Sequence, residues 1–188
     1  MTQTTAAILS SVPAWYFDSE GRYIVFREDG TGELWCACNF NYWIAADFEW
    51  KIADNSVSAA ADAQVGGSLA AASADDVENS SQLHIQMTLT KRLPESAQTS
   101  VLTKSTLVNE FSLTDEAFKT KTYTVRVEKG RFIQPSRARY ANESSNNFDM
   151  RLVFNPSPYP PKSAWKSLEG GVEDGQFWNH THFVASSS

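Results

Sequence analysis

Hydrophobic and polar residues alternate along several stretches of this chain. In residues 43–52 the polar side chains Asp47, Glu49 and Lys51 share one face, and the other face is apolar, with Ile44, Ala46, Phe48, Trp50 and Ile52. Side chains of a β-strand point alternately to its two faces, so this period of two predicts a strand with one buried and one hydrated face. The same alternation predicts strands at 83–93, 119–128 and 147–154.

A hairpin is predicted near the N-terminus. Residues 22–27 and 33–40 are rich in β-branched and aromatic side chains, and the Asp29-Gly30 pair lies between them. Asp-Gly favours the tight turns that join antiparallel strands. Two further strands are predicted, at 100–113 and 176–184.

These signals predict an all-β fold of about eight antiparallel strands in one domain, residues 1–188. A short helix is expected at 4–12, ended by Pro13, and a turn is expected at Lys129-Gly130. Strands joined in sequence order favour an up-and-down barrel, because closure removes exposed edges. A barrel of this size can hold one small ligand. An open sandwich is the alternative.

Residues 53–82 interrupt the strand pattern. They contain nine Ala, six Ser and five acidic residues, with no Lys or Arg. A segment without an apolar stripe is typical of a solvated insertion or a mobile loop, and a lid over a ligand site is the alternative. The whole chain has 22 acidic and 16 basic residues, so the rest of it carries 22 − 5 = 17 acids and 16 bases. The net acidity therefore belongs to the insertion.

Composition and charge narrow the choice of partner. The net charge of −6 argues against nucleic-acid binding, which requires a basic surface. The basic stretch 119–139 is interpreted as a solvated face, with attraction of an anionic partner as the alternative. No apolar run approaches the roughly 20 residues that span a bilayer. The start of the chain shows no secretory signal, and Cys36 and Cys38 are interpreted as reduced core residues, so a cytoplasmic location is expected.

One part of the chain resembles a known family. Trp15, the Asp29-Gly30-Thr31-Gly32 turn and the Phe48-Glu49-Trp50-Lys51 segment follow one another along residues 15–51. This order resembles the lipocalin-like (calycin) barrels. Among their cytosolic members are small enzymes of natural-product pathways that isomerise or cyclise a reactive intermediate. The resemblance implies a β-barrel that acts without a cofactor.

The 23 aromatic rings favour an apolar ligand inside the barrel. The apolar strand faces are expected to line it, because the polar faces have to meet water. Aromatic and methionine side chains adapt to a flat apolar guest, and the alternative is that they fill the core themselves. The candidate ligand-binding residues are Trp35, Phe48, Trp50, Met87, Tyr123, Met150 and Phe154.

Four residues are candidates for moving a proton: Glu49, Tyr23, Arg151 and His182. Glu49 forms a carboxylate pair with Asp47, which is interpreted as part of a solvated outer face. If inside and outside are reversed near the barrel mouth, Glu49 becomes the best general base. His180 and His182 lack an evident third ligand, so no metal is expected.

The favoured hypothesis is a barrel that binds a small, largely apolar molecule and catalyses a cofactor-free isomerisation or cyclisation in secondary metabolism. A non-catalytic carrier with the same pocket is the alternative. A structural protein whose barrel is filled by its own side chains is a third hypothesis. A homodimer is left open as a partner arrangement.

Overall fold

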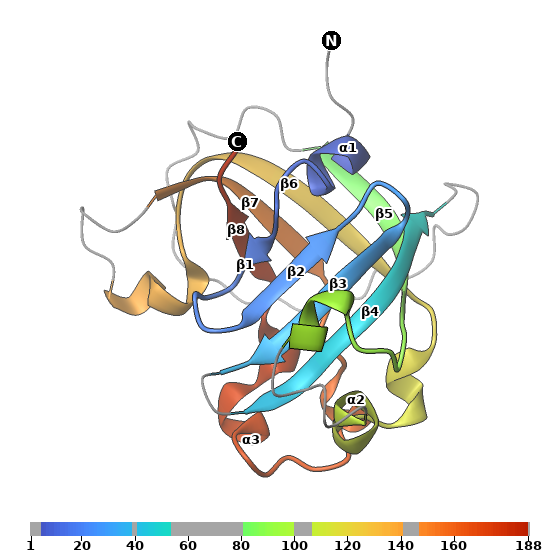
Figure 1. Ribbon diagram of the computed structural model, residues 1–188. Coiled ribbons are helices and arrows are strands. Elements are labelled where there is room, and N and C mark those ends of the chain that lie inside the picture. The colour runs from blue at the N-terminus through green and yellow to red at the C-terminus, as the bar shows by residue number, and fades with distance from the viewer. Residues whose placement is uncertain (1–4, 39–40, 54–80, 100–106, 141–146, 188) are drawn as a thin grey trace, which may run out of the picture.

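The computed structural model describes residues 5–38, 41–53, 81–99, 107–140 and 147–187. Its strands close into a barrel in which each strand is antiparallel to its neighbour in sequence, and the last strand pairs with the first. Figure 1 shows this ring of strands. The strands are β1 (Trp15–Tyr16), β2 (Arg22–Phe26), β3 (Thr31–Ala37), β4 (Tyr42–Ile52), β5 (Ser81–Leu89), β6 (Lys121–Ile133), β7 (Asn147–Asn155) and β8 (His182–Ala185). The predicted all-β, up-and-down, eight-stranded architecture is confirmed.

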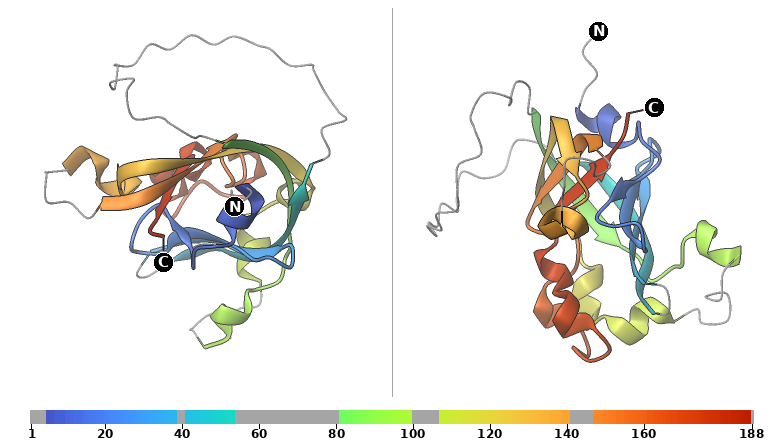
Figure 2. Two further views of the ribbon diagram at one scale, coloured as in Figure 1. Left: turned by 90° about the horizontal axis from the view of Figure 1, so that it is seen from above. Right: turned by 90° about the vertical axis from the view of Figure 1, so that its left-hand side faces the viewer.

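Short helices occupy the connections and the two ends of the barrel. Seen from above, α1 lies over the opening of the ring (Figure 2). It is held there because the Trp15 indole donates a hydrogen bond of 2.9 Å to the carbonyl of the buried Leu9. The helices are α1 (Thr5–Leu9), η1 (Glu95–Thr99), α2 (Val108–Ser112), η3 (Asp115–Phe118), η4 (Pro135–Tyr140), η5 (Lys162–Ala164), α3 (Val172–Gly175) and η6 (Phe177–Asn179).

The inward-facing side chains pack on one another. The rings of Phe26 and Phe48 lie 5.4 Å apart and those of Phe26 and Phe154 6.4 Å apart. Phe154 also contacts Tyr123 and Phe183, each at 5.9 Å between ring centroids. All five side chains are buried. The alternation of the sequence thus places the rings in a common core, as the period of two predicts.

A second, smaller core lies on the outside of the barrel. Trp35 and Ala45 point outward from β3 and β4, yet both are buried because they pack with Ala97 and Val108. These partners belong to η1 and α2, so the chain after β5 covers the outer face of β3 and β4. This cover was not apparent from the strand pattern.

Two predicted elements are wrong. The strand expected at 100–113 is helix α2 over Val108–Ser112, and residues 100–106 lie outside the described part. The prediction treated the apolar residues of this segment as buried strand positions, but Leu107 and Phe111 are 47% and 69% exposed. No turn forms at Lys129-Gly130, because β6 continues through these residues. The pairing of β6 with β7 shifts register between Lys129 and Phe132, as at a β-bulge.

Other boundaries also differ from the predictions. The short strand β1 was not predicted, and only the end of 176–184 is a strand, β8. The expected insertion at 53–82 falls almost entirely on residues outside the described part. Among the described residues, no helix has the length and apolar character needed to cross a membrane.

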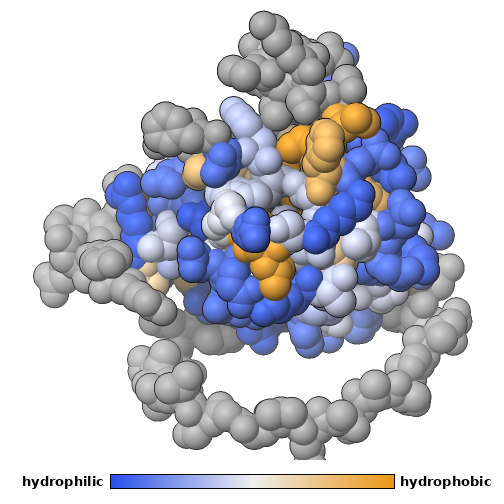
Figure 3. All heavy atoms as spheres, turned by 90° about the horizontal axis from the view of Figure 1, so that it is seen from below, coloured by the Kyte–Doolittle hydropathy of each residue, from blue (hydrophilic) through white to orange (hydrophobic). Residues whose placement is uncertain are grey.

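The lower end of the barrel carries α2 and α3 (Figure 1). Seen from below, this end is largely hydrophilic and is interrupted by small apolar patches (Figure 3). Leu107 and Phe111 of the α2 region are the most exposed large apolar residues there. Isolated exposed apolar side chains of this kind are common on soluble domains.

Candidate functional site

A pocket of about 550 Å³ lies on the outer side of the barrel, beside the turn that joins β2 to β3. Residues of this turn form one wall, β4 forms the floor, and β5 with the residue preceding β6 forms the opposite wall. Small-molecule sites in proteins typically enclose about 300–1,000 Å³, so the pocket has a suitable size. Its lining residues are Asp29, Gly30, Thr31, Glu49, Trp50, Lys51, Gln86, Thr88 and Thr120.

The Asp29-Gly30-Thr31 turn is rigidly built. The Asp29 carboxylate accepts hydrogen bonds from the backbone N–H and the hydroxyl of Thr31, at 2.9 and 2.6 Å. These bonds lower the pKa of Asp29 and hold it as an anion. Gly30 has φ of 83°, a left-handed conformation that glycine adopts without a steric penalty. The motif that favoured a hairpin therefore also shapes one wall of the pocket.

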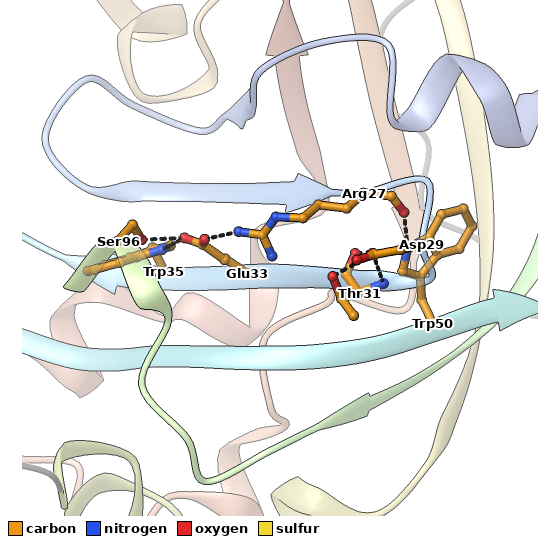
Figure 4. Close-up of polar contacts among 7 residues, drawn as sticks. All are labelled: Arg27, Asp29, Thr31, Glu33, Trp35, Trp50 and Ser96. Atoms are coloured by element: carbon orange, nitrogen blue, oxygen red, sulfur yellow. Dashed lines mark hydrogen bonds and ion pairs between the residues drawn. The ribbon is translucent and has the colours of Figure 1, made fainter. Parts of the chain in front are cut away.

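Trp50 ties this turn to β4, as Figure 4 shows. Its backbone N–H donates a hydrogen bond of 2.7 Å to the Gly30 carbonyl. Its indole N–H lies 3.1 Å from the carbonyl oxygens of Arg27 and Thr31. Three contacts from one residue fix the distance between the turn and the pocket floor.

Strand register sets the polar side chains in two rows across the pocket. Thr31 pairs with Glu49, and Glu49 pairs with Thr88 on the next strand. Lys51 pairs with Gln86 in the adjacent row. At the far wall, the Thr88 and Thr120 hydroxyls are 2.7 Å apart. Cross-strand partners lie on the same face of a sheet, so these groups converge on one space.

Within the part of the chain that the structure describes, the side chains of Glu49, Lys51 and Gln86 make no hydrogen bond or ion pair. Glu49 and Lys51 are exposed and carry opposite charges on the same strand face. Both charges are thus available to a ligand.

A buried carboxylate lies next to this pocket on β3 (Figure 4). Glu33 is only 4% exposed and forms an ion pair with Arg27. Its other oxygen accepts hydrogen bonds from the Trp35 indole and the Ser96 hydroxyl, both at 2.7 Å. Three donors compensate its charge, and Glu33 therefore anchors the η1 segment to the barrel wall.

The structure does not gather the four predicted proton-transfer residues. Tyr23, Glu49, Arg151 and His182 point outward from β2, β4, β7 and β8 respectively. Only Glu49 lines the pocket. The reversal of inside and outside under which Glu49 was expected to act as general base is not observed: Phe48 is buried inside the barrel, and Glu49 is exposed on its outer face.

Tyr23 stacks on Trp35 with 5.6 Å between ring centroids. Burial and, less strongly, the Glu33 charge raise the pKa of Tyr23 to about 12. Its hydroxyl therefore stays protonated at neutral pH and can act as a hydrogen-bond donor. Trp35, a predicted ligand-binding residue, lies in the outer core instead of the barrel interior.

Arg151 and His182 belong to another polar cluster, on β6 to β8. The Arg151 guanidinium forms an ion pair with the buried Glu128 and lies 4.5 Å from the centre of the Phe132 ring. Partial desolvation and the nearby Arg151 charge lower the pKa of His182. Arg151 thus compensates the charge of the buried Glu128, and its contacts stabilise the fold.

The remaining predicted ligand-binding residues behave as the apolar pattern implies. Phe48, Met87, Tyr123, Met150 and Phe154 are buried inside the barrel, and Trp50 is half-buried at its margin. They form part of the continuous core. Within the described ranges, no group of three or more His, Cys, Asp or Glu side chains is placed to hold a metal ion.

The strand pattern also missed the environment of His180. This residue precedes β8 and stacks on Phe17 at 3.7 Å between ring centroids. Its Nδ1 is buried and has no hydrogen-bond partner. Burial, followed by the charge of Arg22, lowers the pKa of His180 to about 4. No signal in the sequence distinguished His180 from its neighbour His182.

Comparison of the chain with protein-family models, with curated proteins and with solved structures finds no match.

Proposed function

We propose that this protein is a small-molecule-binding β-barrel whose ligand occupies the pocket around Glu49. The observation that carries the proposal is the set of polar side chains in this pocket. Glu49, Lys51 and Gln86 have no partner among the described residues, although they converge on one space of about 550 Å³. Polar groups that face one concave space fix the orientation of a ligand and give a binding site its specificity.

The proposal includes catalysis as its finer part. The resemblance to lipocalin-like barrels implies a cofactor-free isomerisation or cyclisation, and in this form of the proposal Glu49 accepts a proton from the bound ligand. Lys51, two residues along the same face, would then stabilise negative charge that develops on the ligand. A carrier would use the same groups for binding alone, so turnover of the bound ligand separates the two forms of the proposal.

The interior of the barrel, occupied by an apolar ligand, is the alternative binding site. It is less well supported, because the inward-facing rings of Phe26, Phe48 and Phe154 already contact one another. The outer pocket, in contrast, offers a defined space with polar groups that have no partner among the described residues, and this difference favours it.

Nuclear magnetic resonance of the labelled protein tests the site. A library of polar and apolar metabolites is titrated, and the expected binder shifts the backbone amides of Gly30, Gln86 and Thr88 in a saturable way. Glu49→Gln and Lys51→Met should weaken binding about tenfold each, since each removes a charge-assisted contact. The control variants Glu169→Gln and Lys129→Met alter exposed residues outside the pocket and should bind normally.

Two results would count against the outer site. Saturable shifts confined to interior residues such as Met87 and Phe154 would move the ligand into the barrel. Equal affinity in Glu49→Gln, Lys51→Met and wild type would show that these charged groups take no part in binding.

The proposal also includes a cytoplasmic location. The free thiols of Cys36 and Cys38 are compatible with this location.

A further inference from the structure

The outer pocket contains groups of opposite charge that do not neutralise one another. Asp29 and Glu49 are acceptors, whereas the Lys51 ammonium is only a donor. Seven of the nine lining residues have polar side chains, the exceptions being Gly30 and Trp50, whose indole N–H already bonds to backbone carbonyls. An apolar molecule would leave these polar groups desolvated without partners, which is costly.

The same charges leave a small ion incompletely matched. An anion such as a phosphate or carboxylate would be repelled by two carboxylates, and a cation would be attracted by these carboxylates but would leave the Lys51 ammonium without a partner. A neutral molecule that both donates and accepts hydrogen bonds can instead satisfy all three charged groups together. The Gln86 amide and the Thr88 hydroxyl, which can also act in both senses, extend this requirement across the pocket.

The spacing of the polar groups specifies the ligand further. Adjacent strands lie about 4.8 Å apart, and residues i and i+2 of one strand about 6.7 Å apart. Glu49 and Lys51 are related in the second way, and each faces a polar partner across the strands, Thr88 and Gln86. Side chains on such a grid reach hydroxyl groups on different edges of one six-membered ring.

From these observations, we propose that the Glu49 pocket binds a neutral polyhydroxylated molecule, a saccharide or polyol. In this complex the carboxylates of Glu49 and Asp29 accept hydrogen bonds from ligand hydroxyls, and the Lys51 ammonium donates to ligand oxygens. This assignment rests on the proposed function and names the class of its ligand. It differs from the expectation of a largely apolar ligand, and it concerns this site alone.

The test is a titration of the full chain with four kinds of probe. Glucose, maltose and myo-inositol represent the proposed class, and a diamine (putrescine), a dicarboxylate (succinate) and an apolar fluorescent dye represent the others. At least one neutral probe should shift the amides of Gly30, Gln86 and Thr88 to saturation. Glu49→Gln and Thr88→Val should weaken that binding about tenfold, because the first removes a charged acceptor and the second removes a hydroxyl. Glu169→Gln should leave it unchanged.

The outcomes separate this inference from the proposed function. Saturation of the same amides by putrescine or succinate, with no response to the neutral probes, would overturn the ligand class and keep the pocket as a binding site. Binding of the dye with shifts only at interior residues would overturn both. Failure of every neutral probe to saturate the pocket, up to the solubility of each, would also overturn the assignment to saccharides and polyols.

Discussion

Glu33 and Asp47 face each other across β3 and β4 on the outer surface of the barrel, but only Glu33 has its charge compensated. Arg27, Trp35 and Ser96 donate to the Glu33 carboxylate. The Asp47 carboxylate receives no hydrogen bond from the described residues. Partial burial, and then the neighbouring negative charge of Glu33, raise the pKa of Asp47. Two carboxylates in register therefore have opposite effects on the stability of the fold.

Replacing Asp47 with Asn should stabilise the protein at neutral pH. Because the folded-state pKa of Asp47 is raised, the folded protein holds its proton more strongly than the unfolded chain, and ionisation at higher pH costs stability. Asn resembles the protonated carboxyl and removes this cost, which stays below about 1 kcal/mol because water screens the partly exposed group. Urea unfolding at pH 7 should show the gain, and it should shrink as the pH falls through the pKa of folded Asp47. A loss of stability at pH 7 would contradict the assigned environment.

Replacing Glu33 with Gln should have the opposite effect. The substitution removes the charge that Arg27 pairs with, and one amide cannot accept from all three donors as well as a carboxylate does. We expect the free energy of unfolding to fall by about 2 kcal/mol. The matched control is Glu28→Gln, an exposed residue of the same hairpin, which should change stability by less than about 0.5 kcal/mol. Equal effects of the two substitutions would argue against the buried network.

Asn109 bonds to the part of β4 that β5 does not reach, because β5 pairs only with residues 48–52 of β4. Its side-chain oxygen accepts a hydrogen bond of 2.9 Å from the Ala45 N–H, and its amide donates one of 2.7 Å to the Ala45 carbonyl. Asn109 thus replaces a missing strand. Asn109→Leu should lower the free energy of unfolding by about 2–4 kcal/mol, because it leaves two buried backbone groups unpaired. Phe111→Ala, on the exposed side of the same helix, should be nearly neutral in the same denaturant experiment.

The strand pattern was sufficient to predict most of the barrel because alternation directly encodes the two faces of a strand. It correctly placed Phe48, Tyr123 and Phe154 inside the barrel and Glu49 and Lys51 outside it. It could not reveal that the outer face of β3 and β4 is covered. That cover depends on Asn109 and Ala97, whose roles arise from tertiary contacts instead of local periodicity.

The candidate site was predictable only in part for the same reason. Glu49 stood out because it follows Asp47 at a spacing of two residues on a predicted strand. No sequence pattern singles out Gln86, Thr88 and Thr120. The register of β5 against β4 brings Gln86 and Thr88 to the pocket, and the Thr120 hydroxyl contacts that of Thr88. Register between distant strands is not visible in the sequence of either strand alone.

Gly32, the last residue of the Asp-Gly-Thr-Gly turn, is required by close packing. A Cβ at this position would lie 2.2 Å from the Phe48 ring and 2.3 Å from the Val25 carbonyl oxygen. Because the second contact is with backbone, a rotamer change cannot relieve it, and Gly32→Ala should cost about 3 kcal/mol or more. Gly130→Ala is the control: its Cβ would meet only the Phe132 side chain, at 3.1 Å, and the cost should stay below about 1 kcal/mol. Thermal unfolding followed by circular dichroism measures both.

His180 should make the protein lose stability in mild acid. Burial, and then the charge of Arg22, lower its pKa from 6.5 to about 4 in the folded state. As the pH falls below 6.5, the unfolded chain binds a proton that the folded protein excludes, so the contribution of the neutral ring is present above pH 6.5 and is lost towards pH 4. The loss has an upper limit of about 3 kcal/mol.

The substitution His180→Phe isolates this contribution, because it keeps an aromatic ring against Phe17 and removes the titrating nitrogens. Its free energy of unfolding should fall less than that of the wild type between pH 6.5 and 4. An NMR titration of the imidazole measures the folded-state pKa directly. A midpoint near 6.5, or the same pH dependence in both proteins, would show that His180 reaches water and that its buried Nδ1 does not govern acid stability.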